Sequence, residues 1–271
     1  MKVLVGADPE VFVTNPNHDG FVCAHGLIPG DKKNPFKVDF GAVQVDGTAL
    51  EFNIVPASTC EEFVHHITKV YSTLEGMVPG FKLQITPVAH FDKEYFKSLP
   101  GEAKRLGCDP DFDAWEMDMN TPPPNRLPMR TAAGHVHVGW TDGLDVRDKS
   151  VFNDCGVVAR ELDYSLGLSS LLYDTDETRR SMYGKAGAFR PKPYGVEYRV
   201  LSNVWLKSAD LMRWVYEGTV ATMNRVEKGE LRAKEYGDLA RRIINSPLNE
   251  RPSDWMDVVQ ELGHPLPKGV A

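Results

Sequence analysis

The sequence predicts an α+β protein whose strands pair antiparallel. The first 55 residues contain short runs rich in β-forming residues, separated by Gly, Asn, Asp and Pro, at residues 3–5, 11–13, 21–24 and 43–45. Asp46-Gly47 lies between the segments AVQV and ALEF, which is a good hairpin signal. The last quarter of the chain has helical apolar spacing. Strands joined by such short turns argue against a doubly wound nucleotide fold.

The other elements are predicted by caps and periodicity. Thr59 and Glu62 form a capping box, and the apolar residues from there to Leu74 repeat at helical spacing. Further strands are expected at residues 81–85, 134–140 and 195–201. Helices are expected at residues 149–173, 208–227, 235–245 and 253–262. Ser208 and Ser253 are the expected N-caps of the second and the last of them.

The whole chain, 1–271, is expected to form a single catalytic domain that ends in a helical part at 208–271. Residues 98–130 differ from the rest because they contain many prolines and acids and little periodicity. A long irregular stretch of this kind is usually functional or disordered. We expect either a lid or acceptor-binding loop, or a surface excursion anchored by Phe112 and Trp115.

Composition excludes several classes of protein. A formal net charge of −7 argues against a dedicated nucleic-acid surface or an anionic-membrane surface. The N-terminus lacks the pattern of a secretory signal, and no apolar run approaches the ~20 residues that span a bilayer. The four cysteines are scattered without a CxxC pair, which indicates reduced thiols in a cytoplasm rather than a zinc cluster. The oligomeric state stays open.

Polar residues that can bind metals recur two positions apart in four predicted strands. Such residues share one face of a strand. The pairs are Asp8 and Glu10, Glu51 and Asn53, His135 and His137, and Glu197 and Arg199. Each pair alone is typical of a half-exposed strand. If the strands are neighbours, however, several carboxylates converge and their repulsion requires cations. Carboxylates suit Mg²⁺ or Mn²⁺, and glutamate-rich sites that add substrate phosphates favour Mg²⁺ with ATP.

Four segments carry a family resemblance: GADPEVFV at 6–13, DGTALEFNI at 46–54, RTAAGHVHVGW at 130–140 and YGKAGAFRPKPYGVEYRVLSN at 183–203. Together they resemble, in order, the second type of the carboxyl–amine ligase (amidoligase) family, small enzymes found mostly in bacteriophages. That family is distantly related to glutamine synthetase and glutamate–cysteine ligase. The resemblance implies a glutamine-synthetase-like curved antiparallel sheet with helices on its outer face, ATP with Mg²⁺ (or Mn²⁺) as cofactors, and a cytoplasmic location, in the host if a phage encodes the chain.

The resemblance also implies roles for single residues. The metal ligands would be Asp8, Glu10, Glu51, His135 and Glu197. The nucleotide would contact His137, Arg190, Arg199, Lys185 and Arg130, the last two being the weaker candidates. Residues acting directly in catalysis would be Arg199, Arg190 and Glu51. The two histidines could exchange roles. Asp8 is shorter than the family's glutamate, and Gly139 stands where serine is usual, so the number of metals stays open.

Such a site would activate a carboxylate with ATP as an acyl phosphate, which an amine then attacks. The expected product is an amide or isopeptide. A guanidino-kinase-like phosphotransferase on the same fold is an alternative. A metal-dependent hydrolase is a further one, although Arg190 and Arg199 count against it. A binding protein without activity would not need to keep these ligand positions. The sequence does not identify the carboxylate or the amine.

Overall fold

The structure, a computed structural model, describes residues 2–17, 20–104, 111–121 and 127–270. Within them, every strand pairing is antiparallel. The main sheet follows the order β3 (Phe36–Val38), β4 (Gly41–Asp46), β5 (Ala49–Ile54), β1 (Leu4–Thr14), β11 (Gly134–Gly139), β13 (Gly195–Tyr198), β12 (Ala188–Lys192), β8 (Phe112–Asp113) and β9 (Asp118–Met119). Also paired with β1 are β2 (Phe21–Val22) and β6 (Lys82–Gln84), and a separate pair joins β7 (Val88–His90) to β10 (Met129–Thr131).

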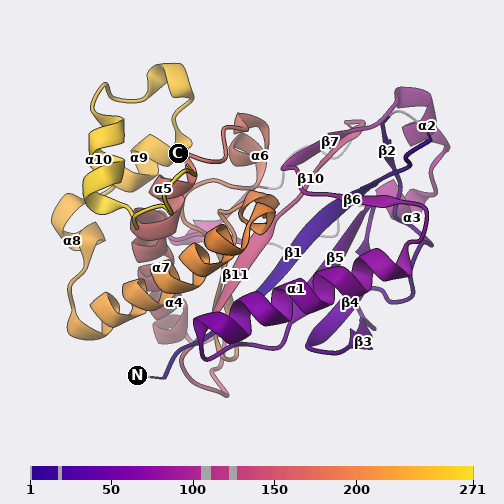
Figure 1. Cartoon of the computed structure of the whole chain (residues 1–271). Coiled ribbons are helices and arrows are strands. Elements are labelled where there is room, and N and C mark those ends of the chain that lie inside the picture. Colours follow the sequence, from indigo (N-terminus) through magenta and orange to yellow (C-terminus); the bar gives the residue numbers. More distant parts are fainter. Residues whose placement is uncertain (1, 18–19, 105–110, 122–126, 271) are drawn as a thin grey trace.

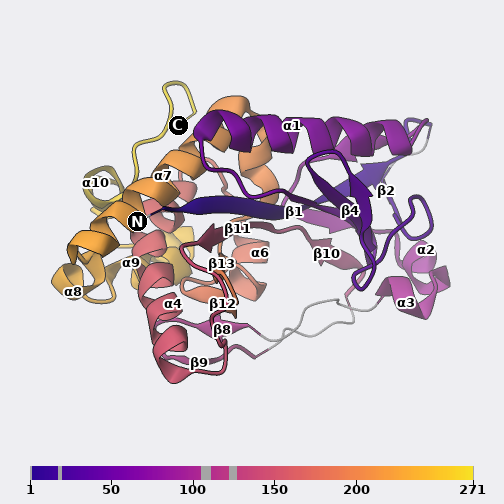
Figure 2. The same cartoon turned by 90° about the horizontal axis from the view of Figure 1, so that it is seen from below.

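Helices cover one face of this sheet (Figures 1 and 2). The long ones are α1 (Cys60–Met77), α4 (Lys149–Leu162) and α7 (Ala209–Lys228). Packing joins α1 to β4 and β5, α4 to β12 and β13, and α7 to both α1 and α4. A π-helical turn, Asp163–Gly167, continues α4 into α5 (Leu168–Ser170). The short helices are α2 (Lys93–Ser98), α3 (Gly101–Lys104), α6 (Glu177–Met182), α8 (Arg232–Tyr236), α9 (Leu239–Asn245) and α10 (Trp255–Leu262), with 3-10 turns at Asn203–Lys207 and Leu248–Glu250.

Alternation along the strands separates a buried face from a polar one. On β1, Val5, Ala7 and Val11 belong to the main core, whereas Asp8 and Glu10 point to the other face. The same period of two holds on the neighbouring strands, whose core residues are Leu50 and Phe52 on β5, Val136 and Val138 on β11, and Val196 and Tyr198 on β13. The helices therefore cover the apolar face, and the polar candidates lie on the opposite one.

The α+β class and the antiparallel sheet are confirmed. The hairpin at Asp46-Gly47 is present, with Gly47 at φ 60°. The N-caps Thr59 and Ser208 accept hydrogen bonds from the backbone N–H groups of Glu62 and Leu211. Residues 208–271 are mainly helical, as expected.

Several boundaries were wrong. The runs at 3–5 and 11–13 are parts of one strand, because β1 continues through Pro9 and changes partner there, from β11 to β5. The helix expected at 235–245 is two, α8 and α9, interrupted at Gly237, whose φ is 63°. Asp254, rather than Ser253, precedes α10 at the N-cap.

The segment 98–130 has more regular structure than expected, since it contains α3, β8, β9 and the start of β10. Residues 105–110 and 122–126, which include Cys108, lie outside the described part. Phe112 packs against Phe152 and Phe189, and Trp115 against Tyr164, so both aromatic residues are anchored to the body of the protein. The described part of the segment is thus consistent with the anchored alternative, and the lid stays a prediction.

Cys23, Cys60 and Cys155 are free thiols. Among the described helices, none combines the length and the apolar character that crossing a membrane requires.

The surroundings of Gly134 and Gly76 predict opposite effects of a glycine-to-alanine substitution on stability. A Cβ added to Gly134 would lie 2.3 Å from both Ser202 O and Trp205 Nε1, whereas one on Gly76, an exposed position of α1, meets nothing within 4 Å. We expect Gly134→Ala to lower the free energy of unfolding by about 1–3 kcal/mol through overpacking. Gly76→Ala should raise it by about 0.5–1 kcal/mol through helix propensity. Urea unfolding of both variants measures these two changes in the free energy of unfolding. Equal changes would contradict the close packing of β11 at Gly134.

Candidate active site

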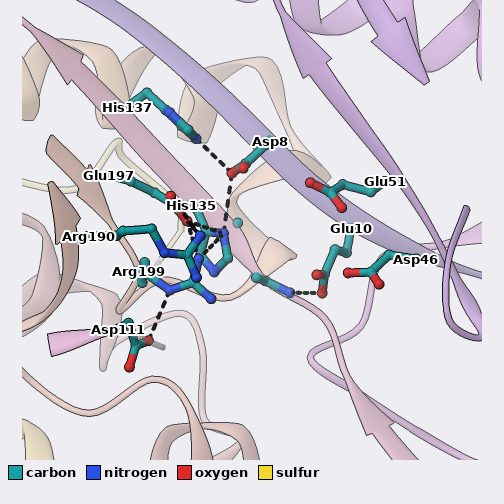
Figure 3. Close-up of polar contacts among 12 residues, drawn as sticks. Asp8, Glu10, Asp46, Glu51, Asp111, His135, His137, Arg190, Glu197 and Arg199 are labelled. Atoms are coloured by element: carbon teal, nitrogen blue, oxygen red, sulfur yellow. Dashed lines mark hydrogen bonds and ion pairs between the residues drawn. The ribbon is translucent and has the colours of Figure 1, made fainter. Parts of the chain in front are cut away.

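Strand register brings the candidate residues of β1, β5, β11 and β13 together on the polar face (Figure 3). Residues directly opposite one another in an antiparallel pair have neighbouring side chains. Four such pairs consist of candidates alone: Asp8 and His135, His137 and Glu197, Glu10 and Glu51, and Arg190 and Glu197. The four polar pairs of the sequence therefore form one surface.

The first group at this surface is centred on Asp8. Its Oδ1 lies 3.0 Å from His137 Nε2 and 3.3 Å from His135 Nδ1, which is also 3.4 Å from Glu197 Oε1. Asp8, His137 and Glu197 each offer one ligand atom within 4.8 Å of the others. Asp8 Oδ1 and His137 Nε2 are buried and contact each other, but neither makes a hydrogen bond of good geometry within the described residues. A cation bound here would satisfy both atoms, so the group fits a metal ion.

Three cations surround Glu197, whose side chain is 0% exposed. Lys192 Nζ lies 2.7 Å and Arg190 Nη1 3.2 Å from Glu197 Oε2, and Arg199 Nη1 contacts Glu197 Oε1. The other side of the Arg199 guanidinium is held by Asp111, 3.0 Å from its Nε. These cations converge from β12 and from the end of β13, which makes this end of the site suitable for phosphate oxygens.

A second acidic group lies farther along β1. It comprises Glu10, Asp46 and Glu51, whose ligand atoms also lie within 4.8 Å of one another. Glu10 accepts a hydrogen bond of 2.8 Å from the backbone N–H of Ala133, and Glu51 accepts one of 2.8 Å from Gln44 Nε2. The group consists of oxygen ligands, which is the donor set that Mg²⁺ prefers.

Burial and neighbouring charge shift the pKa values at the two groups in opposite directions. Burial acts to raise the pKa of Asp8, but His137 and His135 more than offset it and hold that pKa well below 3.8. Burial and Asp8 likewise act to raise the pKa of Glu197, yet Arg199 and the histidines lower it below its ordinary value. In the second group, burial and then Asp46 raise the pKa of Glu10 to about 7.

The same causes act on Glu51 and on the histidines. Burial, followed by repulsion from Asp8 and Glu10, raises the pKa of Glu51 well above 4.5. Burial and Arg199 lower the pKa of His135 to about 4, so its imidazole is neutral at pH 7. Burial acts to lower the pKa of His137, but attraction to Asp8 raises it above 6.5. The carboxyl groups of Asp8 and Glu197 are thus ionised in the metal-free protein, whereas those of Glu10 and Glu51 tend to retain protons.

A cavity of about 610 Å³ opens beside Asp8, His137 and Glu51. Its lining includes Gly6 and Gly139 on the neighbouring strands β1 and β11, which have no side chains to fill it. The lining also includes the aromatic rings of Trp140 and Tyr194, Ile54 and Pro56, and the polar groups of Asn53 and Thr141. The Tyr194 hydroxyl also contacts His137 Nδ1 and so orients that imidazole. The cavity can hold a planar ring system next to the metal-competent group.

Two of the residues expected at the nucleotide, Arg130 and Lys185, make their contacts away from this group, and their nucleotide roles stay predictions. Arg130 uses its guanidinium on backbone carbonyls, with Nη1 2.7 Å from Met129 O and Nη2 2.5 Å from Lys104 O, and it stacks on Phe96. Lys185 lines a different cavity, between α6 and α9. Both residues lie within the segments that carry the resemblance, but the contacts of their side chains are with other parts of the chain.

Sequence reasoning missed four residues of the site: Asp46, Asp111, Lys192 and Tyr194. Lys192 was detectable, because it lies two positions after Arg190 and so shares its face of β12. Asp46 is part of the Asp-Gly hairpin signal, and this role in a turn accounts for the residue without indicating a ligand. Asp111 reaches Arg199 from a distant, poorly periodic segment, and no local signal indicates that contact.

Comparisons with models of known protein families and with curated proteins find no match to this chain.

The raised pKa of Glu10 predicts a pH-dependent effect of Glu10→Gln. The stability that protonated Glu10 contributes is fully present below about pH 4.5 and is lost as the pH rises through about 7. Glutamine stays neutral and can still accept the bond from Ala133. In metal-free buffer we therefore expect the variant to be more stable than the wild type at pH 8, by about 1–3 kcal/mol, and to match it near pH 5.

Urea unfolding at both pH values measures this difference, with Glu75→Gln, an exposed change on α1, as the matched control. Equal stability of Glu10→Gln and the wild type at pH 8 would contradict a protonated Glu10.

Proposed function

We propose that the protein is an ATP- and Mg²⁺-dependent carboxylate–amine ligase on a glutamine-synthetase-like sheet. The observation that supports this function best is the arrangement around Glu197. Two metal-competent acidic groups lie on one sheet face, and three cations, Arg190, Lys192 and Arg199, meet at one end of it. Bound metals and a nucleotide triphosphate need this combination of charges. The antiparallel sheet with helices on one face is consistent with the proposed fold.

The residues fit two metal ions. Asp8, His137 and Glu197 would hold one, with His135 beside them, and Glu10, Asp46 and Glu51 would hold the other. Metal ions at these positions would neutralise phosphate charge and polarise the γ-phosphoryl group. Both histidines approach these carboxylates, His137 Nε2 at 3.0 Å from Asp8 Oδ1 and His135 Nδ1 at 3.3 Å from the same atom, so either assignment of their roles fits.

Arg190, Lys192 and Arg199 would bind the phosphoryl group that is transferred. All three already contact a fully buried carboxylate, so they are held close together before any ligand arrives. Cations positioned in advance stabilise developing charge without reorganisation during the reaction. Asp111 would keep the Arg199 guanidinium in the plane that two phosphate oxygens require. The 610 Å³ cavity, with its glycines and Trp140, would take the base of the nucleotide.

The proposed reaction has two steps. A carboxylate oxygen of the substrate attacks the γ-phosphorus of ATP, the bond to the β–γ bridging oxygen breaks, and ADP leaves. The amine nitrogen then attacks the carbonyl carbon of the acyl phosphate, the carbon–oxygen bond to phosphate breaks, and the amine proton goes to phosphate or solvent. No protein nucleophile is needed. The side chains of this site bind, orient and neutralise charge.

The proposed ligase reaction should give ADP and inorganic phosphate as products, because Arg190, Lys192 and Arg199 would gather around the γ-phosphoryl group that is transferred. Screening acid–amine pairs with ATP and Mg²⁺ by mass spectrometry should reveal a product lighter than its two substrates by one water. Formation of AMP and pyrophosphate would contradict the proposal. A phosphorylated acceptor without free phosphate would instead identify the phosphotransferase alternative.

Glu197→Gln should abolish turnover, since it removes a metal ligand and the group that gathers the three cations. We expect kcat to fall at least tenfold, a loss of about 1.4 kcal/mol or more in transition-state stabilisation. The lowered pKa of Glu197 means that its charge stabilises the fold, so the variant should also melt at a lower temperature.

Activity of Glu197→Gln is therefore measured well below its melting temperature, with circular dichroism as a check of folding. Asp8→Asn, a second change in the same group, and Glu75→Gln, on the exposed side of α1, complete the series. Retention of wild-type activity by Glu197→Gln and Asp8→Asn would refute the metal assignment.

A further inference from the structure

Asp163 is a buried carboxylate behind the sheet, on the side opposite the candidate active site. It is the first residue of the π-helical turn and is 0% exposed. Its Oδ2 accepts a hydrogen bond of 2.7 Å from Trp115 Nε1, and its Oδ1 accepts one of 2.7 Å from the Tyr198 hydroxyl. No Lys, Arg or His of the described residues forms an ion pair with it. Burial raises its pKa to about 7, so a carboxylate is unfavourable here on electrostatic grounds alone.

These two donors lie next to the residues of one ion pair of the site, and the backbone N–H of Gly187 is a further donor to Asp163. Tyr198 lies on β13 between Glu197 and Arg199 in sequence. Trp115 lies in the hairpin formed by β8 and β9, four residues after Asp111. Asp111 and Arg199 meet at 3.0 Å on the polar side. One buried carboxylate therefore holds both elements from behind.

The π-helical turn brings Asp163 close enough to reach both donors. Leu168 N–H donates to Asp163 O across this turn. Gly167, in the same turn, lies against the same groups, and a Cβ there would be 2.8 Å from the Tyr198 hydroxyl and 3.3 Å from Asp163 Oδ1. The helix thus approaches β13 more closely than a side chain at 167 would allow. π-turns of this kind are frequent near functional sites.

Other contacts hold the outer part of the hairpin. Arg160 Nη1 donates to Ala114 O at 2.7 Å, and Arg241 Nη2 lies 3.4 Å from Asp113 Oδ2. Ala114 N–H donates to Gly187 O at 2.9 Å. These contacts do not involve Tyr198 or Asp163. Loss of the bond between Trp115 and Asp163 should therefore loosen the hairpin against β13 without unfolding it.

We propose that Asp163 is a positioning residue that fixes the β8–β9 hairpin against β13 and thereby sets the Asp111–Arg199 pair. Asp163 touches neither substrate nor metal, and it acts through Trp115 and Tyr198. The inference rests on the proposed function in one respect, because the importance of Arg199 for phosphoryl transfer belongs to that proposal. The anchoring of the hairpin does not depend on it.

The test removes one hydrogen bond and keeps the ring. Trp115→Phe loses the indole N–H but retains an aromatic ring against Tyr164. The matched control is Trp255→Phe, the same change on α10, where Trp255 stacks on Arg251. We expect Trp115→Phe to lower kcat/KM for ATP about tenfold or more, and Trp255→Phe to leave it within about twofold. Asp163→Asn, which retains one acceptor, should fall between the wild type and Asp163→Ala.

A double-mutant cycle separates positioning from general stability. In an Asp111→Asn background, Trp115→Phe should reduce kcat/KM by less than about twofold further, because both changes act on the same pair. Independent, multiplying losses would overturn the inference, as would an unchanged kcat/KM in Trp115→Phe.

Amide hydrogen exchange across residues 111–121 gives a readout without catalysis. Exchange should be faster in Trp115→Phe than in the wild type or in Trp255→Phe. Unchanged exchange would overturn the anchoring role whatever the kinetics show. A wild-type chain inactive with every acid–amine pair would contradict the ligase proposal alone, and faster exchange in Trp115→Phe would then still support the anchoring role.

Discussion

Repulsion among carboxylates gathered on one face of a sheet is the constraint on which the rest of this site depends. The registers of β1 with β5 and β11, of β4 with β5 and of β11 with β13 bring together the side chains of Asp8, Glu10, Asp46, Glu51 and Glu197. Such groups cannot all ionise in a poorly hydrated site unless something compensates their charge. The groups around the five carboxylates compensate this charge, either with fixed cations or with retained protons.

The two ends of the site are compensated differently. Around Glu197 and Asp8 the protein supplies the positive charge itself, through Lys192, the arginines and His137. Around Glu10 and Glu51 the described residues supply less positive charge, with Lys32 Nζ 3.5 Å from Asp46 Oδ2, and the raised pKa values of Glu10 and Glu51 indicate that protons provide the rest. A proton held in this way is displaced easily by a divalent cation. The site therefore has one end rich in fixed cations and one end whose glutamates retain protons.

The apolar face of the sheet makes this arrangement rigid. Each strand that carries a polar candidate also contributes buried Val, Leu, Phe or Tyr side chains to the core beneath α1, α4 and α7. A slip of one residue in register would turn every candidate into the core, so hydrophobic burial fixes the polar side chains indirectly. Asp163 adds a polar contact behind the sheet, where packing alone would not fix the angle between the hairpin and β13.

The sequence by itself determined the class of the fold and the faces of the strands. Alternation with a period of two is a local property, so pairs such as His135 and His137 could be assigned to one face without knowing the neighbours. The Asp-Gly hairpin and the Thr59 and Ser208 caps are local for the same reason. Only the tertiary structure decided which strands adjoin. That choice grouped His137 with Asp8 and Glu197, added Asp46 and Asp111, and left Arg130 and Lys185 elsewhere. These contacts depend on the pairing of segments far apart in the chain and on the direction of long side chains, which nearness to a motif in sequence does not fix.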